Sequence, residues 1–246
     1  MYWKDTWYLG DYIEHEYKYP GMYGAKGEKR AKRRKATPEQ VRQQNQRNRE
    51  KKVRRLIKAN FMENDYWITL KYPKGTRIRM KEAKKHMKYF LDKTRNDYKK
   101  RDAVFKFIYR IEIGKRGGLH VHILLNRITD ADLIIKKNWK NGTIHFSLAY
   151  EAGGFRRLAD YIVKPPAEDG EPEKEVMAYS PSRNLVRPQP ERELYFRRTV
   201  RKLIEEGPQP TPGFYIVKDS IVSGINPYTG MSYLHYEEER IGKRDG

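Results

Sequence analysis

Two alternating segments joined by a glycine-containing turn constrain the fold more than any other part of the sequence. The segment AVFKFIYRIEIG (103–114) alternates like a β-strand, and LHVHILL (119–125) is typical of a returning strand after the turn at 115–118. Strands joined so closely can pair only in the antiparallel sense. We therefore expect an antiparallel sheet at the centre of the molecule.

Further strand and helix patterns surround this hairpin. Strands are expected at 66–72 and 143–150, and helices at 81–98, 130–139 and 155–164. The resulting order is β, α, β, β, α, β, α. This order predicts an α+β fold in which a central antiparallel β-sheet carries flanking helices, in the manner of ferredoxin-like or RRM-like sheets.

The composition changes on both sides of this core, and the changes suggest four parts. Residues 1–25 are expected to be irregular or to form short strands, and residues 191–207 to form a basic helix followed by a terminal hairpin that turns at Asn226-Pro227. The predicted parts are a basic N-terminal arm and helix (1–60), the core (61–166), a proline-containing loop (167–190) and a C-terminal helix and β-hairpin extension (191–246).

Positive charge is concentrated near the N-terminus. Residues 26–58 contain 15 Lys and Arg against three Glu, which is +12 of the formal net charge of +21. Thr37 is a plausible N-cap and Gln40 completes a capping box, so a helix should run to about Asn60. Its few apolar residues leave it little core to join, which favours an arm lying on nucleic acid over a solvated linker helix.

The overall charge and the residue types that are missing narrow the function classes. A sequence pI of about 9.9 indicates a polyanionic partner, and nucleic acid is the commonest one. The absence of cysteine excludes disulfides, thiolate metal sites and cysteine nucleophiles. No apolar run reaches membrane-spanning length and no GxxxxGK[ST] loop is present, so we expect a cytoplasmic protein with no membrane partner and no nucleotide cofactor on this chain.

The hairpin carries a candidate metal site. His120 and His122 are two residues apart on one predicted strand, so their side chains share a face of the sheet. If Gly114 to Gly118 form the turn, Glu112 lies opposite His120 on that same face. Two imidazoles and one carboxylate form a recognised ligand set for a divalent cation, with a polar strand face as the alternative. His145 on the next strand is interpreted as structural.

A tyrosine and a lysine on a later helix are candidate catalytic residues. Tyr161 and Lys164 are three residues apart, which would place a phenol and an ammonium group on one helical face. A nearby metal and a cation would both favour the phenolate, which can attack a phosphodiester. The ammonium group could position the phosphate or protonate the leaving oxygen.

Taken together, these motifs resemble the His-hydrophobe-His (HUH) endonuclease superfamily. The apolar strand YWITLKY (66–72), the paired-histidine strand LHVHILL and the Tyr161–Lys164 helix match its three motifs in order. The histidines precede the tyrosine, as in rolling-circle replication initiators of plasmids and single-stranded DNA phages, whereas conjugative relaxases have the reverse order. Arg157 stands four residues before Tyr161, so the pattern is similar to that of single-tyrosine members. The Gly-Gly before Leu119, in place of a longer loop, is a departure from the family pattern.

The resemblance implies a concrete activity. Such enzymes hold Mg²⁺ or Mn²⁺ with the histidine pair and a third ligand, here Glu112. Their tyrosine cuts one DNA strand and stays linked to its 5′ end, which starts rolling-circle replication. The implied partners are single-stranded DNA at a replication origin in a bacterial host and a host helicase. The candidate phosphate-contacting residues are Arg33, Arg34, Arg54, Arg55, Arg157 and Arg183.

Three other interpretations remain open from the sequence. A non-catalytic basic DNA- or RNA-binding module would show no metal dependence and no covalent adduct. A single-tyrosine transposase of the same superfamily would share the chemistry and differ in the DNA it recognises. A structural basic protein, such as a capsid or ribosome-associated component, would carry the tyrosine and the metal set by accident.

Overall fold

The computed structural model describes most of the chain and divides it into two compact units. The described residues are 1–21, 36–114, 118–149, 155–164, 179–226 and 230–242. One unit comprises residues 45–186, and the other joins residues 1–44 to residues 187–246. No described helix combines the length and the apolar character needed to cross a membrane.

The unit of residues 45–186 is built on a five-stranded antiparallel sheet. Its strand order is β6-β3-β5-β4-β7, and the central strand is the one that carries the paired histidines. The strands are β3 (Tyr66–Lys71), β4 (Phe107–Ile113), β5 (Leu119–Leu125), β6 (Thr143–Leu148) and β7 (Ser180–Pro181). The expected α+β fold with a central antiparallel sheet is therefore confirmed.

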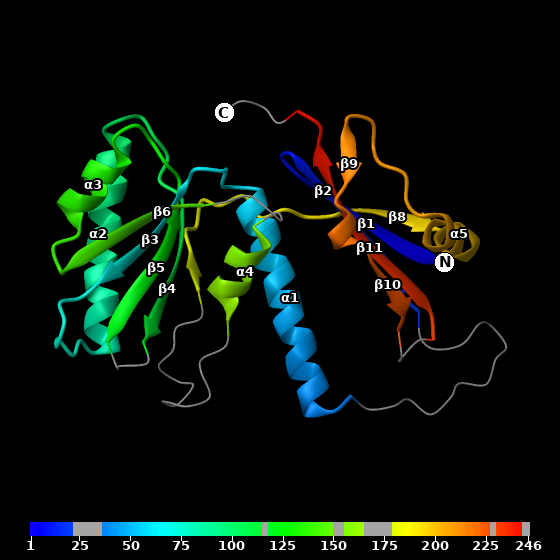
Figure 1. Ribbon diagram of the computed structural model, residues 1–246, viewed down its shortest axis with the longest axis horizontal. Coiled ribbons are helices and arrows are strands. Elements are labelled where there is room, and N and C mark those ends of the chain that lie inside the picture. The colour runs from blue at the N-terminus through cyan, green and yellow to red at the C-terminus, as the bar shows by residue number, and fades with distance from the viewer. Residues whose placement is uncertain (22–35, 115–117, 150–154, 165–178, 227–229, 243–246) are drawn as a thin grey trace. The chain divides into compact units, whose positions relative to one another are not determined.

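Helices cover both faces of this sheet (Figure 1). On one face, α2 (Met80–Lys99) and α3 (Ala131–Asn138) bury a core that includes Ile111, Val121 and Ile123. On the other face, α4 (Arg156–Val163) and the C-terminal part of α1 (Pro38–Lys58) pack on Ile108 and Leu124. Successive residues of a strand point to opposite faces, so His120 and His122 lie on the face of α1 and α4.

Helix α1 begins as the sequence predicts and ends differently. The Thr37 Oγ1 accepts from the Gln40 amide at 3.2 Å, and the Gln40 Oε1 accepts from the Thr37 amide at 3.0 Å, which confirms the capping box. The expectation that this helix has little core to join is wrong for its last turns. Val53, Leu56 and Ile57 are buried against α4 and the sheet, because one apolar stripe suffices to anchor a helix otherwise polar all round.

The second unit is a six-stranded antiparallel sheet made from both ends of the chain. Its order is β10-β11-β2-β1-β8, with β9 paired to β11. The N-terminal segment, expected to be irregular or short-stranded, forms a full hairpin whose turn contains Gly10 at a φ of 71°, a conformation that glycine adopts readily. The strands are β1 (Tyr2–Leu9), β2 (Tyr12–Lys18), β8 (Glu191–Tyr195), β9 (Phe214–Ile216), β10 (Val222–Ile225) and β11 (Ser232–Arg240).

The C-terminal segment contains one confirmed and one wrong prediction. The terminal hairpin is present, because β10 pairs with β11 from Val222↔His235 to Ile225↔Ser232; its proposed turn residue Pro227 lies outside the described residues. The helix expected over 191–207 is split into β8 and α5 (Arg197–Glu206), with a short 3₁₀ turn, η1 (Lys218–Ser220), further on. Pairing with β1 and the 2.6 Å ion pair from Arg192 Nε to Asp5 Oδ1 override the local helical pattern.

Charged groups are buried in this second sheet. His15 is 4% exposed, lies 3.2 Å from the Glu238 carboxylate and has Thr6 Oγ1 3.3 Å from its Nδ1. Burial lowers the pKa of His15 to about 4, and this effect outweighs the opposing charge of Glu238. The imidazole is therefore held neutral inside the sheet.

This burial predicts a loss of stability in mild acid. Because the folded pKa of His15 lies below the ordinary value of about 6.5, the unfolded chain binds a proton between pH 6.5 and 4 that the folded chain does not. The free energy of unfolding should fall by about 3 kcal/mol as the pH decreases through that window. Urea unfolding followed by circular dichroism should show this fall. His15→Gln should flatten it, and His86→Gln should leave it intact; an unchanged pH profile in His15→Gln would contradict the prediction.

Candidate active site

The register of the β4–β5 hairpin brings the predicted ligands together. Glu112 pairs with His120 and Arg110 with His122, which confirms the register expected from the turn at Gly114 to Gly118. The turn is closed by a 2.9 Å hydrogen bond from the Gly114 amide to the Gly118 carbonyl. Glu112, His120 and His122 therefore project from the same face of the sheet.

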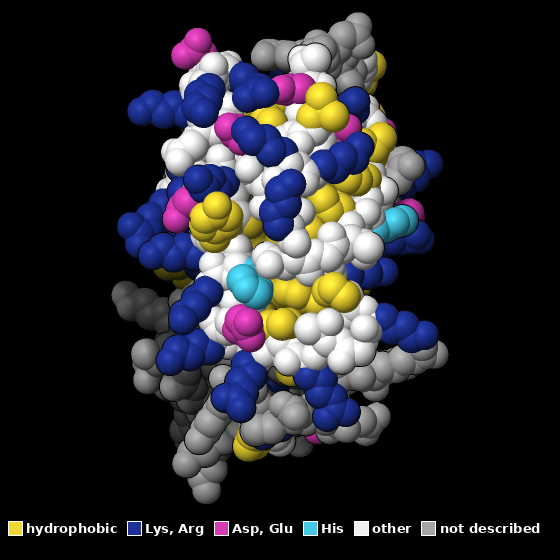
Figure 2. Space-filling view, turned by 90° about the vertical axis from the view of Figure 1, so that its left-hand side faces the viewer, with side chains coloured by type: hydrophobic (Ala, Val, Ile, Leu, Met, Phe, Trp, Pro, Cys, Tyr) yellow, Lys and Arg dark blue, Asp and Glu magenta, His cyan; other side chains and the backbone are white. Residues whose placement is uncertain are grey.

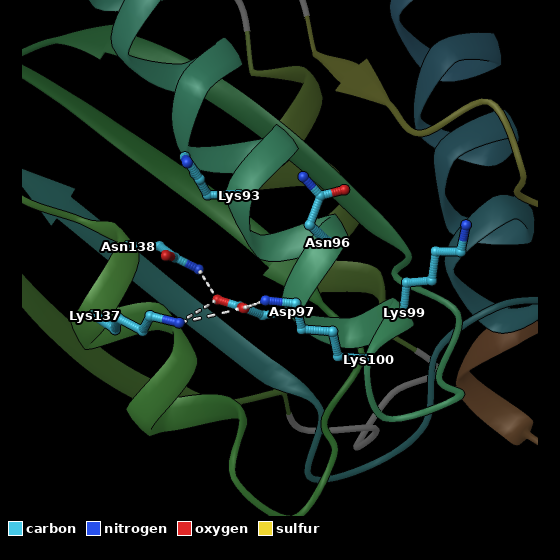
Figure 3. A pocket seen from close by; sticks show the side chains of 7 residues that line it. All are labelled: Lys93, Asn96, Asp97, Lys99, Lys100, Lys137 and Asn138. Carbon is cyan, nitrogen blue, oxygen red and sulfur yellow. Dashed lines mark hydrogen bonds and ion pairs between the residues drawn. The ribbon is translucent and has the colours of Figure 1, made fainter.

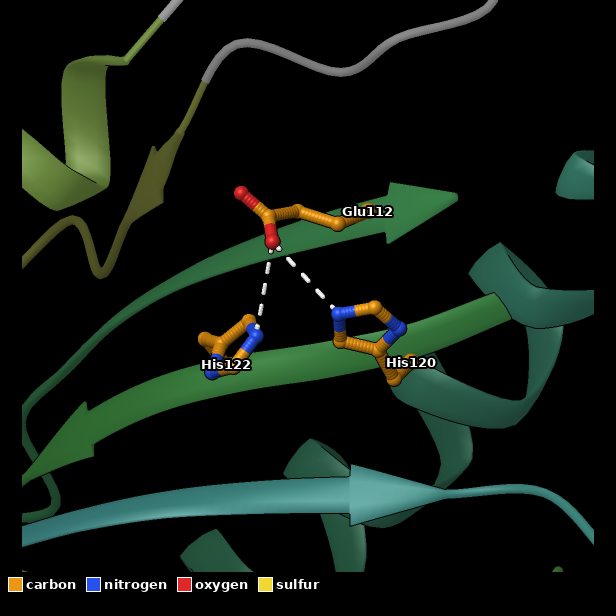
Figure 4. Close-up of side chains that lie close together, drawn as sticks. All are labelled: Glu112, His120 and His122. Atoms are coloured by element: carbon orange, nitrogen blue, oxygen red, sulfur yellow. Dashed lines mark ion pairs between the residues drawn. The ribbon is translucent and has the colours of Figure 1, made fainter. Parts of the chain in front are cut away.

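These three side chains form a group that suits a divalent cation (Figure 4). Glu112 Oε2 lies 3.5 Å from His120 Nε2 and 3.4 Å from His122 Nε2, and the three ligand atoms all lie within 4.8 Å of one another. Neighbouring ligands of an octahedral cation with bonds of about 2.1 Å are about 3 Å apart. The group is thus close to the spacing that a bound ion requires, and two imidazoles with one carboxylate leave coordination positions open.

Tyr161 on α4 reaches this same group. Its hydroxyl lies 2.9 Å from Glu112 Oε2 and 2.8 Å from His122 Nε2. The two atoms that contact the phenol are therefore two of the three atoms that would hold the metal. Residues 39 and 49 positions apart in the sequence converge within hydrogen-bonding distance.

Trp67 on β3 packs against both the histidine and the tyrosine. Its ring stacks on His122 with centroids 5.6 Å apart and an interplanar angle of 18°. It meets the Tyr161 ring edge to face at 5.8 Å. These contacts restrict the orientation of both rings. The sequence places Trp67 on a strand but does not assign it to the site, because nothing in the spacing says which strand lies next to β5.

Strand β3 adds two further polar groups to this face. Thr69 pairs with His122 and lies 3.2 Å from its Nδ1, so an Nδ1–H that donates to Thr69 Oγ1 leaves the Nε2 lone pair directed at the metal group. Lys71 pairs with His120 and is exposed, which places a cation beside the group. His145 pairs with Thr69 from the far side and is exposed; it lies outside the described set of ligand atoms.

Arg110 links the sheet to the helix that carries the tyrosine. It is 4% exposed, and its Nε forms a 2.9 Å ion pair with Glu112 Oε1. Its Nη1 donates to the backbone carbonyls of Ile162 at 3.1 Å and of Tyr161 at 3.4 Å, and also to that of Lys164. One buried guanidinium therefore holds the carboxylate of the metal group and the C-terminal end of α4. The sequence did not predict this role, because an arginine on a strand gives no signal of what it caps.

Electrostatics act in opposite directions on the carboxylate and the phenol. Burial raises the pKa of Glu112, but hydrogen bonds from His120, His122 and Tyr161 and the charge of Arg110 outweigh it, so the pKa is lowered and the carboxylate is ionised. Burial, the hydrogen bond to Glu112 and its negative charge raise the pKa of Tyr161 against the opposing charge of Arg110. The phenol is thus protonated in this arrangement, and a positive charge at the group would act against that.

Lys164 does not share a helical face with Tyr161, and that expectation is corrected. Helix α4 ends at Val163, and Lys164 is its C-cap with a φ of −49° and a ψ of 131°. The residue before a proline avoids the helical region, and Pro165 follows Lys164 in the sequence. Lys164 is exposed, and its amide still donates to the Tyr161 carbonyl at 3.3 Å.

The candidate phosphate-contacting arginines occupy different environments. Arg157 and Arg183 are exposed, whereas Arg55 is partly buried and Arg54 is 7% exposed, with its charge near the Asp160 carboxylate. Arg54 therefore offers little surface to a DNA strand. Arg33 and Arg34 lie outside the described residues.

A second group with metal-ligand chemistry lies in the other unit. It consists of Glu14, Glu16 and His235, and the sequence did not predict it because these residues come from β2 and β11. His235 Nε2 lies 2.8 Å from Glu14 Oε1, and its Nδ1 lies 3.2 Å from the Ser220 carbonyl. Both ring nitrogens are thus already engaged within the protein, which is typical of a structural network.

The role of Arg110 predicts a large stability effect. Arg110→Met should leave Glu112 and three helix-end carbonyls without their buried partner and lower the free energy of unfolding by about 3–5 kcal/mol. Arg95→Met is the matched control, because Arg95 forms a 2.7 Å ion pair with Asp92 while both side chains are 52% exposed. That exposed pair should contribute about 0–1 kcal/mol. Urea unfolding of both variants measures the difference, and similar losses would contradict the clamp.

Comparison with known proteins assigns the core of this unit to a family. Residues 65–166 match the family model of the replication-associated protein ORF2. No curated protein and no solved structure matches the chain. The matched segment runs from the start of β3 to just past Lys164 and so contains the metal group and Tyr161. Residues 65–166 are therefore a domain of this replication-associated protein family, in agreement with a rolling-circle replication initiator of the HUH type.

Proposed function

We propose that this replication-associated protein nicks single-stranded DNA at a replication origin through a covalent bond between Tyr161 and the 5′-phosphate. The observation that carries the proposal is the position of the Tyr161 hydroxyl, 2.9 Å from Glu112 Oε2 and 2.8 Å from His122 Nε2. A nucleophile in contact with two candidate metal ligands is the arrangement that phosphodiester cleavage requires.

Mg²⁺ or Mn²⁺ is the proposed cofactor, held by Glu112, His120 and His122. When bound, such an ion acts as a Lewis acid that draws electron density from the scissile phosphate and favours the phenolate. Thr69 orients His122 for this purpose, and Arg110 keeps the Glu112 carboxylate ionised and in place. Trp67 holds the tyrosine ring against the group.

The chain's residues then account for the bonds that change. The phenol loses its proton, the Tyr161 oxygen forms a bond to phosphorus, and the bond from phosphorus to the 3′ oxygen breaks. The 3′ oxygen leaves as a hydroxyl after taking up a proton, for which the exposed ammonium group of Lys164 is the candidate donor. Attack of a 3′-hydroxyl on the phosphotyrosine reverses these changes and transfers the strand.

Exposed cations around the site are proposed to hold the DNA backbone. Lys71 stands beside His120, and Arg157 and Arg183 are exposed in the same unit. Affinity for single-stranded DNA should therefore fall with salt. A host helicase is the proposed partner for unwinding, and the bacterial cytoplasm the proposed location.

A covalent adduct tests the proposal directly. The protein is incubated with Mn²⁺ and labelled single-stranded fragments of the replicon that encodes it, and products are separated on a denaturing gel. Tyr161→Phe should abolish the retained band while DNA binding persists, and Tyr89→Phe, which alters an exposed tyrosine on α2, should leave the band unchanged. Chelator should also abolish it. A band that survives in Tyr161→Phe refutes the nucleophile, and no band in the unaltered protein leaves a binding module.

The glycine next to His120 gives a separate test of the metal group. A Cβ added at Gly114 would lie 3.2 Å from His120 Cε1, whereas one at Gly118 would meet nothing within 4 Å. Gly114→Ala should therefore displace the imidazole and weaken Mn²⁺ binding about tenfold, as loss of groups that orient a ligand does. Gly118→Ala should bind Mn²⁺ as the unaltered protein does. Calorimetric titration compares them, and equal affinities would count against His120 as a ligand.

A further inference from the structure

A basic pocket lies between α2 and α3, away from the candidate active site (Figure 3). Its volume is about 550 Å³, and it is lined by Lys93, Asn96, Asp97, Lys99, Lys100, Lys137 and Asn138. Four lysines against one carboxylate leave three positive charges in excess. Such a pocket attracts anions, and the four ammonium groups suit phosphate oxygens.

The floor of the pocket is held in place by hydrogen bonds. Asp97 is 6% exposed and accepts from Asn138 Nδ2 at 3.0 Å and from Lys137 Nζ at 3.1 Å. Asn138 Nδ2 also lies 3.4 Å from Thr94 Oγ1. The single carboxylate is therefore already bonded within the pocket and leaves the exposed lysines on the rim to interact with a ligand.

The pocket and the metal group lie on opposite sides of the same sheet. Helices α2 and α3 cover the face of Ile111, Val121 and Ile123, whereas Glu112 and the two histidines project from the other face. The nucleotides at Tyr161 therefore cannot also occupy the pocket. A ligand bound at both places must be long enough to pass around the edge of the unit.

The basic surface continues from the pocket along α2. Figure 2 shows this side of the molecule, where Lys and Arg side chains are spread over most of the face and acidic ones are few. None of the residues that line the pocket is aromatic. Proteins that hold single strands use stacking aromatics, whereas contacts to a duplex backbone need only cations. Exposed lysines along the helix are Lys81, Lys84, Lys85 and Lys88.

From this arrangement we infer that the α2–α3 face binds the backbone of double-stranded DNA that flanks the nicked strand. The inference rests on the proposed nicking function for the identity of the DNA, but it concerns a separate surface. Binding is independent of base sequence, because lysines contact phosphates as point charges.

The test replaces three rim lysines and measures binding to a short fluorescent duplex by anisotropy at several NaCl concentrations. The variant is Lys93→Gln, Lys99→Gln and Lys100→Gln; Lys137 is kept because its loss would leave the buried Asp97 without a partner. Each lost phosphate contact should lower the slope of log K against log[NaCl] by about 0.9, so a decrease of up to about 2.7 is expected.

A control variant carries the same change in charge elsewhere: Arg201→Gln, Lys202→Gln and Lys218→Gln, all exposed in the other unit. The control should change the slope less than the rim variant. Equal slopes in the two variants, or equal weakening of duplex and single-stranded binding in the rim variant, would overturn the inference. The Tyr161 adduct on a short single strand is measured in parallel, and the rim variant should retain it. An unaltered protein that gives no adduct but shows the slope change would refute only the nicking function.

Discussion

The antiparallel register of β4 and β5 is the constraint on which the site depends. Because Glu112 stands opposite His120, the carboxylate and both imidazoles emerge from one face, and a slip of one residue would send Glu112 into the core that α2 and α3 cover. The register is fixed by alternate burial of Ile111, Val121 and Ile123 and by the turn at Gly114 and Gly118. The same packing that stabilises the unit therefore places the candidate ligands.

Local pattern was sufficient for most of the core. The order of strands and helices over 66–164, the capping box at Thr37 and the pairing of Glu112 with His120 follow from spacing and turn residues, and the structure agrees with each. The match of residues 65–166 to a replication-associated family agrees with the resemblance carried by the three motifs. The roles assigned to Tyr161 and the metal group remain proposals, supported by the short contacts between them.

Contacts between distant segments could not be read from the sequence. The split of 191–207 into a strand and a helix depends on β1, at the opposite end of the chain, and the burial of Val53 and Ile57 depends on α4. Trp67, Thr69 and Lys71 became part of the site only once β3 was known to lie beside β5. The helix was expected to include Lys164, although the Pro165 that follows gives a local reason for it to end earlier.

The contact of Arg110 with the end of α4 also affects the potential that a phosphate would meet. The C-terminal end of a helix carries about half a negative charge from its aligned peptide dipoles, and α4 ends beside the ionised Glu112. Without compensation, these two sources would repel an approaching nucleic-acid backbone. The guanidinium lies between them and donates to both, so the helix macrodipole is largely neutralised at the place where the chain presents its tyrosine.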